Sequence, residues 1–485
     1  MKTSWKIFSV LLAVVCLSGQ HVLAQETNRS PEFDLQSVLE VKLAEQIGQL
    51  RAIPVNLGRG RPRAILAVHC PDAEVDPYVE MFFFPKDTLK LTLFNEKGEI
   101  LWRRDLGHGV VPGIWFTPVY PFDLDGDSVD EIWFVNNVDS DHPLSIDNQR
   151  LERIDALTSK TNGQWPWPGP EANQSLSHTF RNFILGGYVR GEPVLVTEQG
   201  TYGPMAMQAH NSDMQLRWEH KIKLDTLGAR GSHMCPVVDI NHDNIDEILW
   251  GERCIELDTG KELFCADRDI YQGHSDVVQP VLDRSSNRWF IYTCRESTNV
   301  SPRVALFDDK GQRIWGRVDR GHMDIGWTAR IGENGEHIAM AIRIGGKTAG
   351  PKGFFRKGVE EFTYDVLTGK EHPLAFSVFG TLPVDLNGDG IHELVRGLAE
   401  GSGEVLDNTG RIIGNINGKA AVASKLLNHP GEQILCYQPD GTVRIWADRN
   451  AADTNEAMKR YSNRFYKTNQ KLTATGYNIV NLGGI

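Results

Sequence analysis

The sequence predicts an all-β fold, a single β-propeller of seven or eight four-stranded blades, from three repeated patterns. Short apolar strands recur at intervals of roughly 40–65 residues, among them 63–68, 192–197, 288–293, 337–342 and 432–437. A turn that leads into a strand ending in Trp recurs at 95–102, 308–315 and 439–446. An acidic loop followed by an apolar strand recurs at 123–134, 239–251 and 385–397. One such sheet cannot bury both faces, whereas a closed ring of sheets leaves no long exposed edge.

Composition narrows the class of protein. The 485 residues include 51 Lys+Arg against 63 Asp+Glu, a net charge of −12, and 40% are hydrophobic. The apolar fraction suffices for a core and excludes a disordered chain, and the acidic excess argues against a nucleic-acid surface. Beyond the N-terminus no segment reaches the roughly 18 apolar residues of a membrane span. We expect a monomer that spans no membrane and holds any anionic ligand with local cations.

The first residues predict export. Lys2 and Lys6 flank the start of an apolar run from Ile7 to Ser18, and small residues precede a cleavage position after Ala24. This pattern is typical of a signal peptide, here 1–24, and indicates a secreted or periplasmic protein. Residues 25–52 are expected to form an N-terminal segment with a short helix, because apolar residues recur at helical spacing over 37–50. The propeller, taken as the catalytic domain, is expected over 53–485.

Histidines recur at equivalent positions of the repeat. His178, His233, His274 and His322 each come just before an expected innermost strand, as does His108. Closure of the ring would bring such residues together around the axis at one face. Arg230 lies close to His233 in the sequence and would make that face cationic. The alternative is a polar, water-filled channel without a specific function.

Two sets of side chains have the composition of metal sites. Asp123, Asp125 and Asp127 alternate in a short turn and could surround Ca²⁺, or could instead only form Asx-turns. His233, Cys235, Cys254 and Cys265 could form a Zn²⁺ site. Alternatively, Cys254 and Cys265 could form a disulfide, since they lie symmetrically about the turn Thr259-Gly260. No organic cofactor is expected.

Four segments carry a resemblance to a known family. The segments are LSHTFRNFILGG (176–187), QAHNSDMQLRWEH (208–220), GARGSHMCPVVDINHDNIDEILWG (228–251) and GHSDVVQP (273–280). They resemble the propeller-fold polysaccharide lyases: rhamnogalacturonan lyases, ulvan lyases and L-rhamnose–glucuronate lyases with their rhamnosidase-like relatives. The resemblance implies an enzyme that cleaves a rhamnose–uronic acid linkage in an acidic polysaccharide by β-elimination. The alternatives are hydrolysis of the same linkage and a propeller that binds carbohydrate or protein without catalysis.

The resemblance also implies site residues. Arg230 matches the arginine of those lyases, His178 and His142 match their two histidines, and His210 falls at the position of their tyrosine. Arginine can pair with a uronate carboxylate through two hydrogen bonds, and histidine can exchange a proton near neutral pH. The side chains expected to bind substrate are Arg181, Tyr202, His274, His322, Trp165 and Trp167.

Overall fold

The computed structural model describes, besides Met1, residues 33–169, 175–296, 300–350, 353–398 and 400–485. The chain divides into two units, Met1–Glu32 and Phe33–Ile485, and the fold described below belongs to the second. The expected signal peptide, 1–24, lies outside the described residues. Within the described ranges, no helix has the length and apolar character needed to cross a bilayer.

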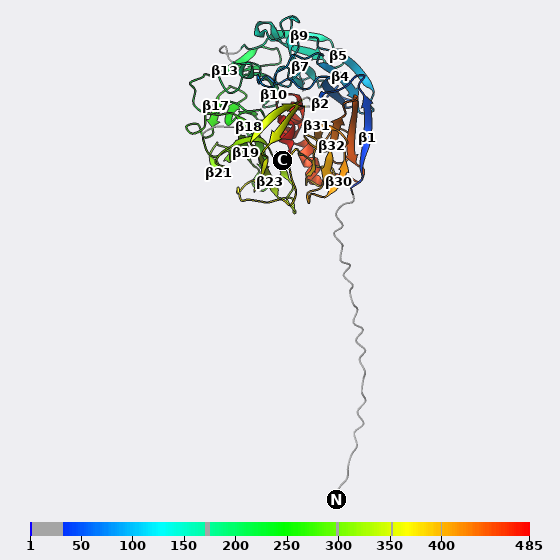
Figure 1. Ribbon diagram of the computed structural model, residues 1–485, viewed down its shortest axis with the longest axis vertical. Coiled ribbons are helices and arrows are strands. Elements are labelled where there is room, and N and C mark those ends of the chain that lie inside the picture. The colour runs from blue at the N-terminus through cyan, green and yellow to red at the C-terminus, as the bar shows by residue number, and fades with distance from the viewer. Residues whose placement is uncertain (2–32, 170–174, 297–299, 351–352, 399) are drawn as a thin grey trace. The chain divides into compact units, whose positions relative to one another are not determined.

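Eight sheets form a ring of blades, which confirms the expected propeller (Figure 1). Blade 1 consists of β2 (Gln49–Val55), β3 (Ala64–Cys70), β4 (Lys90–Asn95) and β5 (Ile100–Asp105). Blade 2 consists of β6 (Val119–Phe122), β7 (Glu131–Asn137), β8 (Gln149–Asp155) and β9 (Thr161–Pro166). Blade 3 consists of β10 (Asn182–Val189), β11 (Glu192–Gln199), β12 (Met205–His210) and β13 (Leu216–Ile222). Blade 4 consists of β14 (Val237–Val238), β15 (Glu247–Trp250), β16 (Arg253–Glu256) and β17 (Glu262–Cys265).

The remaining blades complete the ring. Blade 5 consists of β18 (Ser275–Asp283), β19 (Arg288–Arg295), β20 (Val304–Asp308) and β21 (Arg313–Arg317). Blade 6 has three strands, β22 (His322–Arg330), β23 (His337–Ile344) and β26 (Glu360–Asp365), with an inserted hairpin of β24 (Gly346–Gly350) and β25 (Gly353–Lys357). Blade 7 consists of β27 (Leu382–Val384), β28 (Glu393–Val395), β29 (Glu404–Leu406) and β30 (Ile412–Asn415). Blade 8 consists of β31 (Lys419–Ser424), β32 (Gln433–Tyr437), β33 (Thr442–Asp448) and β1 (Leu35–Lys42).

The sequence pattern of each strand follows its depth in the blade. All seven residues of β3 are buried, whereas β5, at the outer edge of the same sheet, alternates between half-buried and exposed positions. Inner strands are covered on both faces by neighbouring blades and therefore consist of continuous apolar runs, whereas an outer strand keeps the alternating pattern.

The helix expected over 37–50 is wrong, and the propeller begins before residue 53. Residues 35–42 form β1, which pairs antiparallel with β33 from Leu35 opposite Asp448 to Lys42 opposite Thr442. Leu39 and Val41 pack toward the core from alternate positions of this strand. The edge of β33 thus gains a partner from the other end of the chain, and this contact overrides the local helical spacing.

The ring has two distinct faces. Each acidic loop follows the first strand of its blade, whereas the segments that hold His178, His233 and His274 precede first strands and His322 begins one. Ser232 and Ser275, which precede neighbouring first strands, form a parallel bridge. The histidines therefore gather at one end of the ring, here called the histidine face, and the acidic loops lie at the opposite end.

The C-terminal segment occupies the centre of the ring (Figure 1). It comprises α2 (Asn455–Ser462), α3 (Arg464–Asn469), η2 (Gln470–Ala474) and η3 (Asn478–Gly484). Its elements contact the first strands β2, β6, β14, β18, β22, β27 and β31. The sequence pattern did not predict this segment, which fills the axis of the ring between the first strands of the blades.

Candidate active site

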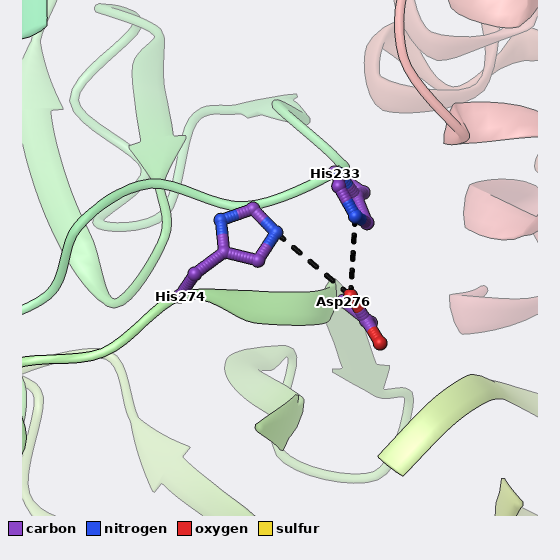
Figure 2. A group of neighbouring side chains, drawn as sticks. All are labelled: His233, His274 and Asp276. Carbon is purple, nitrogen blue, oxygen red and sulfur yellow. Dashed lines mark ion pairs between the residues drawn. The ribbon is translucent and has the colours of Figure 1, made fainter. Parts of the chain in front are cut away.

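Two histidines and an aspartate meet at the centre of the histidine face. Asp276 Oδ1 lies 3.3 Å from His233 Nε2 and 3.8 Å from His274 Nε2, and Figure 2 shows both rings directed at this carboxylate. The two ring centroids are 4.3 Å apart. Burial, with the nearby charge of Arg181, lowers the pKa of both histidines well below their ordinary value. Both imidazoles are therefore neutral near pH 7, the form that binds metal ions.

A charged group extends the cluster toward blade 6. His322 Nε2 lies 3.1 Å from Asp276 Oδ2 and 3.4 Å from Asp324 Oδ1. Burial opposes charge on this ring, but the hydrogen bonds and charges of both carboxylates raise the pKa of His322 to about 10. Lys347 and Arg356, which are cross-strand neighbours on the hairpin β24–β25, both form ion pairs with Asp324. The inserted hairpin thus supplies two cations to the site.

Aromatic rings and Arg181 form the other side of the site. The Tyr202 ring stacks on His274 at 4.2 Å between centroids, and the guanidinium of Arg181 lies 4.6 Å from the Trp115 ring centroid. Arg181 is buried and its Nη2 lies 3.2 Å from Asp76 Oδ1. Tyr202 adopts a φ of +66°, which is strained for a bulky residue and typical of functional sites.

Tyr477, between η2 and η3, lies at the base of the site. Its backbone N–H donates to the carbonyl of His233 at 2.7 Å, and its ring lies 4.8 Å from that of Trp115. Its side chain remains 38% exposed. The enclosure of the hydroxyl and the nearby carboxylates of Glu74 and Asp76 raise the pKa of Tyr477, so its phenol stays protonated and can donate a hydrogen bond or a proton.

His178 lies at the edge of the cluster on the short helix α1 (Leu176–Thr179). Its ring stacks near Tyr202, with centroids 5.8 Å apart. Burial and the charge of Arg181 lower the pKa of His178. His178 is therefore neutral near pH 7 and can accept a proton.

The central residues fit a divalent metal ion. His233, His274 and Asp276 each offer one ligand atom, and these atoms lie within 4.8 Å of one another. His274 Nδ1 is bonded to Thr201 Oγ1 at 2.8 Å, whereas its buried Nε2, directed at Asp276, has no hydrogen-bond partner. A ring whose second nitrogen is fixed by a hydrogen bond is the usual arrangement of a ligating histidine. Two nitrogens and one oxygen suit a transition metal better than Ca²⁺.

Asp123, Asp125 and Asp127 also offer oxygens within 4.8 Å of one another, in the β6–β7 loop on the acidic-loop face. Their carboxylates accept hydrogen bonds from backbone N–H groups of the same loop, as Asx-turns do. The loop geometry is therefore compatible both with Ca²⁺ binding and with Asx-turns that bind no ion. Ca²⁺ binding there stays a prediction.

The expected role of Arg230 is wrong. Its guanidinium donates to the carbonyls of Lys223, Leu224 and Thr226 and so points into the loop that follows β13. Its backbone, and not its side chain, approaches the site: its carbonyl accepts from the N–H of Tyr202 at 2.9 Å, and its N–H donates to the carbonyl of Gly273 at 2.8 Å. Arg181, expected only to bind substrate, is instead an arginine that the fold directs at the cluster, as it does Arg356.

Three further expected residues lie elsewhere. His210 ends β12, the third strand of blade 3, where it pairs with Leu195 toward the acidic-loop face, so it cannot take a place in the cluster. Trp165 belongs to β9, the outermost strand of blade 2, and packs on Trp133. Trp167 is buried in the same hydrophobic core. Both tryptophans therefore stabilise the blade instead of facing a sugar at the axis.

The expected cysteine site does not form. Among the described residues all six cysteines are free and buried. The register of the hairpin places Cys265 opposite Arg253 and Cys254 opposite Phe264, so the two cysteines are not cross-strand partners. Cys235 Sγ instead lies 2.9 Å from Glu198 Oε2. His233, the fourth member of the expected Zn²⁺ set, belongs to the central cluster.

His142 lies on the loop between β7 and β8, with its side chain 72% exposed and its Nδ1 2.7 Å from Asp139 Oδ2. The ion pairs and ring contacts of the described residues do not connect it to the cluster. Its catalytic role stays a prediction. The structure does bring five of the expected residues together around one site: His178, Arg181, Tyr202, His274 and His322.

The most informative residues that the sequence analysis did not assign are Asp276 and Asp324. Both belong to the same pattern, Gly-His-x-Asp, at 273–276 and 321–324. Each aspartate also lies at a register shift in the first strand of its blade. A bulge re-aims a side chain, and here it turns both carboxylates toward the axis. The repeated spacing was the signal that could have identified them.

Comparison with known proteins supports the resemblance. No family model matches the chain. The rhamnogalacturonan exolyase YesX of Bacillus subtilis is 22% identical over 45% of this chain and 45% of its own length. The rhamnogalacturonan endolyase YesW of the same organism is 23% identical over 45% of this chain and 40% of its own. The sequence match thus spans less than half the length of these curated relatives.

Solved structures show the same fold over most of the chain. The structure of YesX matches with a TM-score of 0.68 at 18% identity, covering 91% of this chain and 80% of that one. A rhamnogalacturonan lyase of Bacillus licheniformis matches with a TM-score of 0.69 at 17% identity, covering 90% of this chain and 80% of that one. This chain is thus similar in sequence to rhamnogalacturonan lyases over less than half of its length, and it shares their propeller fold over most of it.

Proposed function

We propose that the protein is a polysaccharide lyase that cleaves a rhamnose–uronic acid linkage of a rhamnogalacturonan-type polysaccharide by β-elimination. The observation that carries the proposal is the convergence, at one face, of a neutral histidine, His178, with the cations Arg181, Lys347 and Arg356. The sequence relation to rhamnogalacturonan lyases supports the substrate class.

In this proposal the cations hold the uronate carboxylate and stabilise the negative charge that develops beside it. His178 removes the proton at C5, the bond between C4 and the departing oxygen breaks, and the electron pair forms a C4=C5 double bond. The departing oxygen takes a proton from the Tyr477 phenol, which solvent then restores. A metal ion at His233, His274 and Asp276 would supply further charge for binding the carboxylate.

Two further proposals follow from the sequence. The expected signal peptide and a polymeric substrate support action outside the cytoplasm, as a secreted or periplasmic enzyme. Ca²⁺ at Asp123, Asp125 and Asp127 would have a structural role, since this loop lies at the opposite face of the ring from the cluster.

Ultraviolet absorbance tests the main proposal. The protein incubated with rhamnogalacturonan should produce the absorbance of an unsaturated uronate, and the double variant His178→Ala/Arg181→Ala should not. Sugar release without that absorbance would instead indicate the hydrolase, and binding without any product would indicate the non-catalytic propeller.

A further inference from the structure

A loop at the edge of the site exposes several apolar side chains. It runs over 76–84, between β3 and β4 of blade 1. The exposed fraction is 43% for Tyr78, 73% for Val79, 38% for Phe83 and 68% for Phe84. Such a concentration of exposed apolar surface on a folded protein marks a binding surface.

The loop is connected to the candidate site at its base. Asp76 pairs with Arg181 at 3.2 Å and also accepts the backbone N–H of Tyr78 at 2.7 Å. Phe82, in the same loop, belongs to one hydrophobic cluster with Leu176 and Phe180, which flank His178 in the sequence. The exposed rings are therefore positioned by the same residues that hold the expected base and the buried arginine.

The loop is also held in one conformation. The N–H groups of Met81 and Phe82 donate to the carbonyl of Tyr78 at 2.8 and 2.9 Å. The Phe82 ring lies 6.1 Å from Phe116 and 5.0 Å from Phe84, centroid to centroid. A pre-organised aromatic surface loses little conformational entropy when a ligand binds.

We propose that Tyr78, Phe83 and Phe84 form a sugar-binding platform that stacks on pyranose rings adjacent to the cleaved linkage. The inference rests on the proposed function and extends it, because it assigns part of the affinity to sugars outside the reacting pair. Aromatic rings offer a flat apolar surface to the C–H face of a sugar. A membrane is disfavoured as the occupant, because residues 76–84 contain Asp76 and Glu80 but no Lys or Arg.

The test compares a polymer with the shortest oligosaccharide that the enzyme cleaves. In a His178→Ala background, in which turnover is strongly slowed, Phe83→Ala/Phe84→Ala should raise the Kd for rhamnogalacturonan about tenfold in affinity electrophoresis. With His178 restored, the same double variant should keep the kcat on the shortest substrate. Ile412→Ala is the matched control, since Ile412 is 58% exposed on the outermost strand β30 of blade 7.

An unchanged Kd for the polymer, in a double variant that melts at the wild-type temperature, would overturn the platform. The platform would also be overturned if the double variant bound polysaccharide as the wild type does but lost binding to anionic phospholipid vesicles or to a protein partner. If the double variant misfolds, Tyr78→Ala and Phe84→Ala singly decide the question by the same Kd. Failure of the proposed lyase function would be recognised by a different result: the wild-type protein would bind the polymer but release no unsaturated product.

Discussion

At the scale of single residues, the site depends on His178 and Arg181, whose pKa values shift in opposite directions because at Arg181 a carboxylate partner outweighs burial. Burial and the charge of Arg181 lower the pKa of His178, whereas Asp76 keeps buried Arg181 charged and raises its pKa against the effect of burial. One neutral base and one permanent cation are thereby available at the same pH.

Replacing His178 by Ala should lower kcat/KM on rhamnogalacturonan by about 10²- to 10³-fold, because a positioned base is lost. The wild-type rate should decrease with falling pH only below the ordinary histidine pKa of about 6.5, since the lowered pKa keeps the ring neutral at more acidic pH. Steady-state kinetics across pH measure both effects.

His429→Ala is the matched control, because His429 lies outside the cluster, is only half-buried, and bonds only to the carbonyl of Pro430 among the hydrogen bonds described for its ring. It should keep the wild-type rate. A His178→Ala enzyme with wild-type kcat/KM would show that another group removes the proton.

Removal of a bound metal gives a second residue-scale prediction. Elemental analysis of the purified protein should show about one divalent transition-metal ion per chain, which His274→Ala loses because one of three ligands is missing. Dialysis against a chelator should lower the rate, and added metal should restore it. Equal metal content in the wild-type and His274→Ala proteins would exclude this cluster as the metal site.

Sequence reasoning identified the histidines of the repeated patterns, but it overlooked Asp276 and Asp324 of the same Gly-His-x-Asp pattern and missed residues outside the repeat. His274 and His322 could be placed at the axis because ring closure superposes equivalent repeat positions. Arg230 was misplaced because a sequence match gives the position of the backbone but not the direction of a long side chain. Lys347 comes from a hairpin that interrupts the repeat, so the repeat could not predict it.

At the scale of elements, the C-terminal segment forms ion pairs with several blades of the ring. Its cations pair with carboxylates that directly precede the second strands of three blades: Lys471 with Asp130 at 2.6 Å, Arg464 with Asp246 at 2.8 Å and Arg460 with Glu432 at 2.6 Å. These pairs position the segment that carries Tyr477 to the base of the site.

Arg460→Met should lower the free energy of unfolding by about 3–5 kcal/mol, because it leaves the buried Glu432 carboxylate without its cationic partner. Denaturant titration measures this change. Lys459→Ala, which removes the exposed pair with Glu456, should change it by less than about 1 kcal/mol. Equal stabilities of the two variants would contradict the structural role of the segment.

Local patterns misled the analysis where a long-range contact decides the structure. The spacing of apolar residues over 37–50 suits a helix, but the open edge of β33 makes residues 35–42 a strand. The symmetry of Cys254 and Cys265 about Thr259-Gly260 suggested a disulfide, but the actual hairpin register places Cys254 opposite Phe264.

At the scale of the whole molecule, the ring is closed by strands from both ends of the chain. β1 is the outer strand of blade 8, and the other three strands of that blade come from residues 419–448. The repeats predicted this fold well because eight similar strands can bury their faces together only in a closed ring. The axial segment was not predicted, since it contains no repeat.

Val41→Asp should lower the free energy of unfolding by about 2–4 kcal/mol, because it buries a charge in β1 where the ring closes. Val38→Asp on the same strand should have little effect, since Val38 is 40% exposed. Thermal or denaturant unfolding compares the two. A reversed order of stabilities would contradict the register of β1 with β33.

The mass of the products tests most directly whether the cluster at the histidine face is a lyase site. The wild-type protein is incubated with a defined rhamnogalacturonan oligosaccharide, and the fragments are weighed by mass spectrometry. We predict that the two fragment masses add up to the mass of the substrate, because elimination adds no water. Fragments whose summed mass exceeds the substrate by one water, or an intact substrate, would contradict the account.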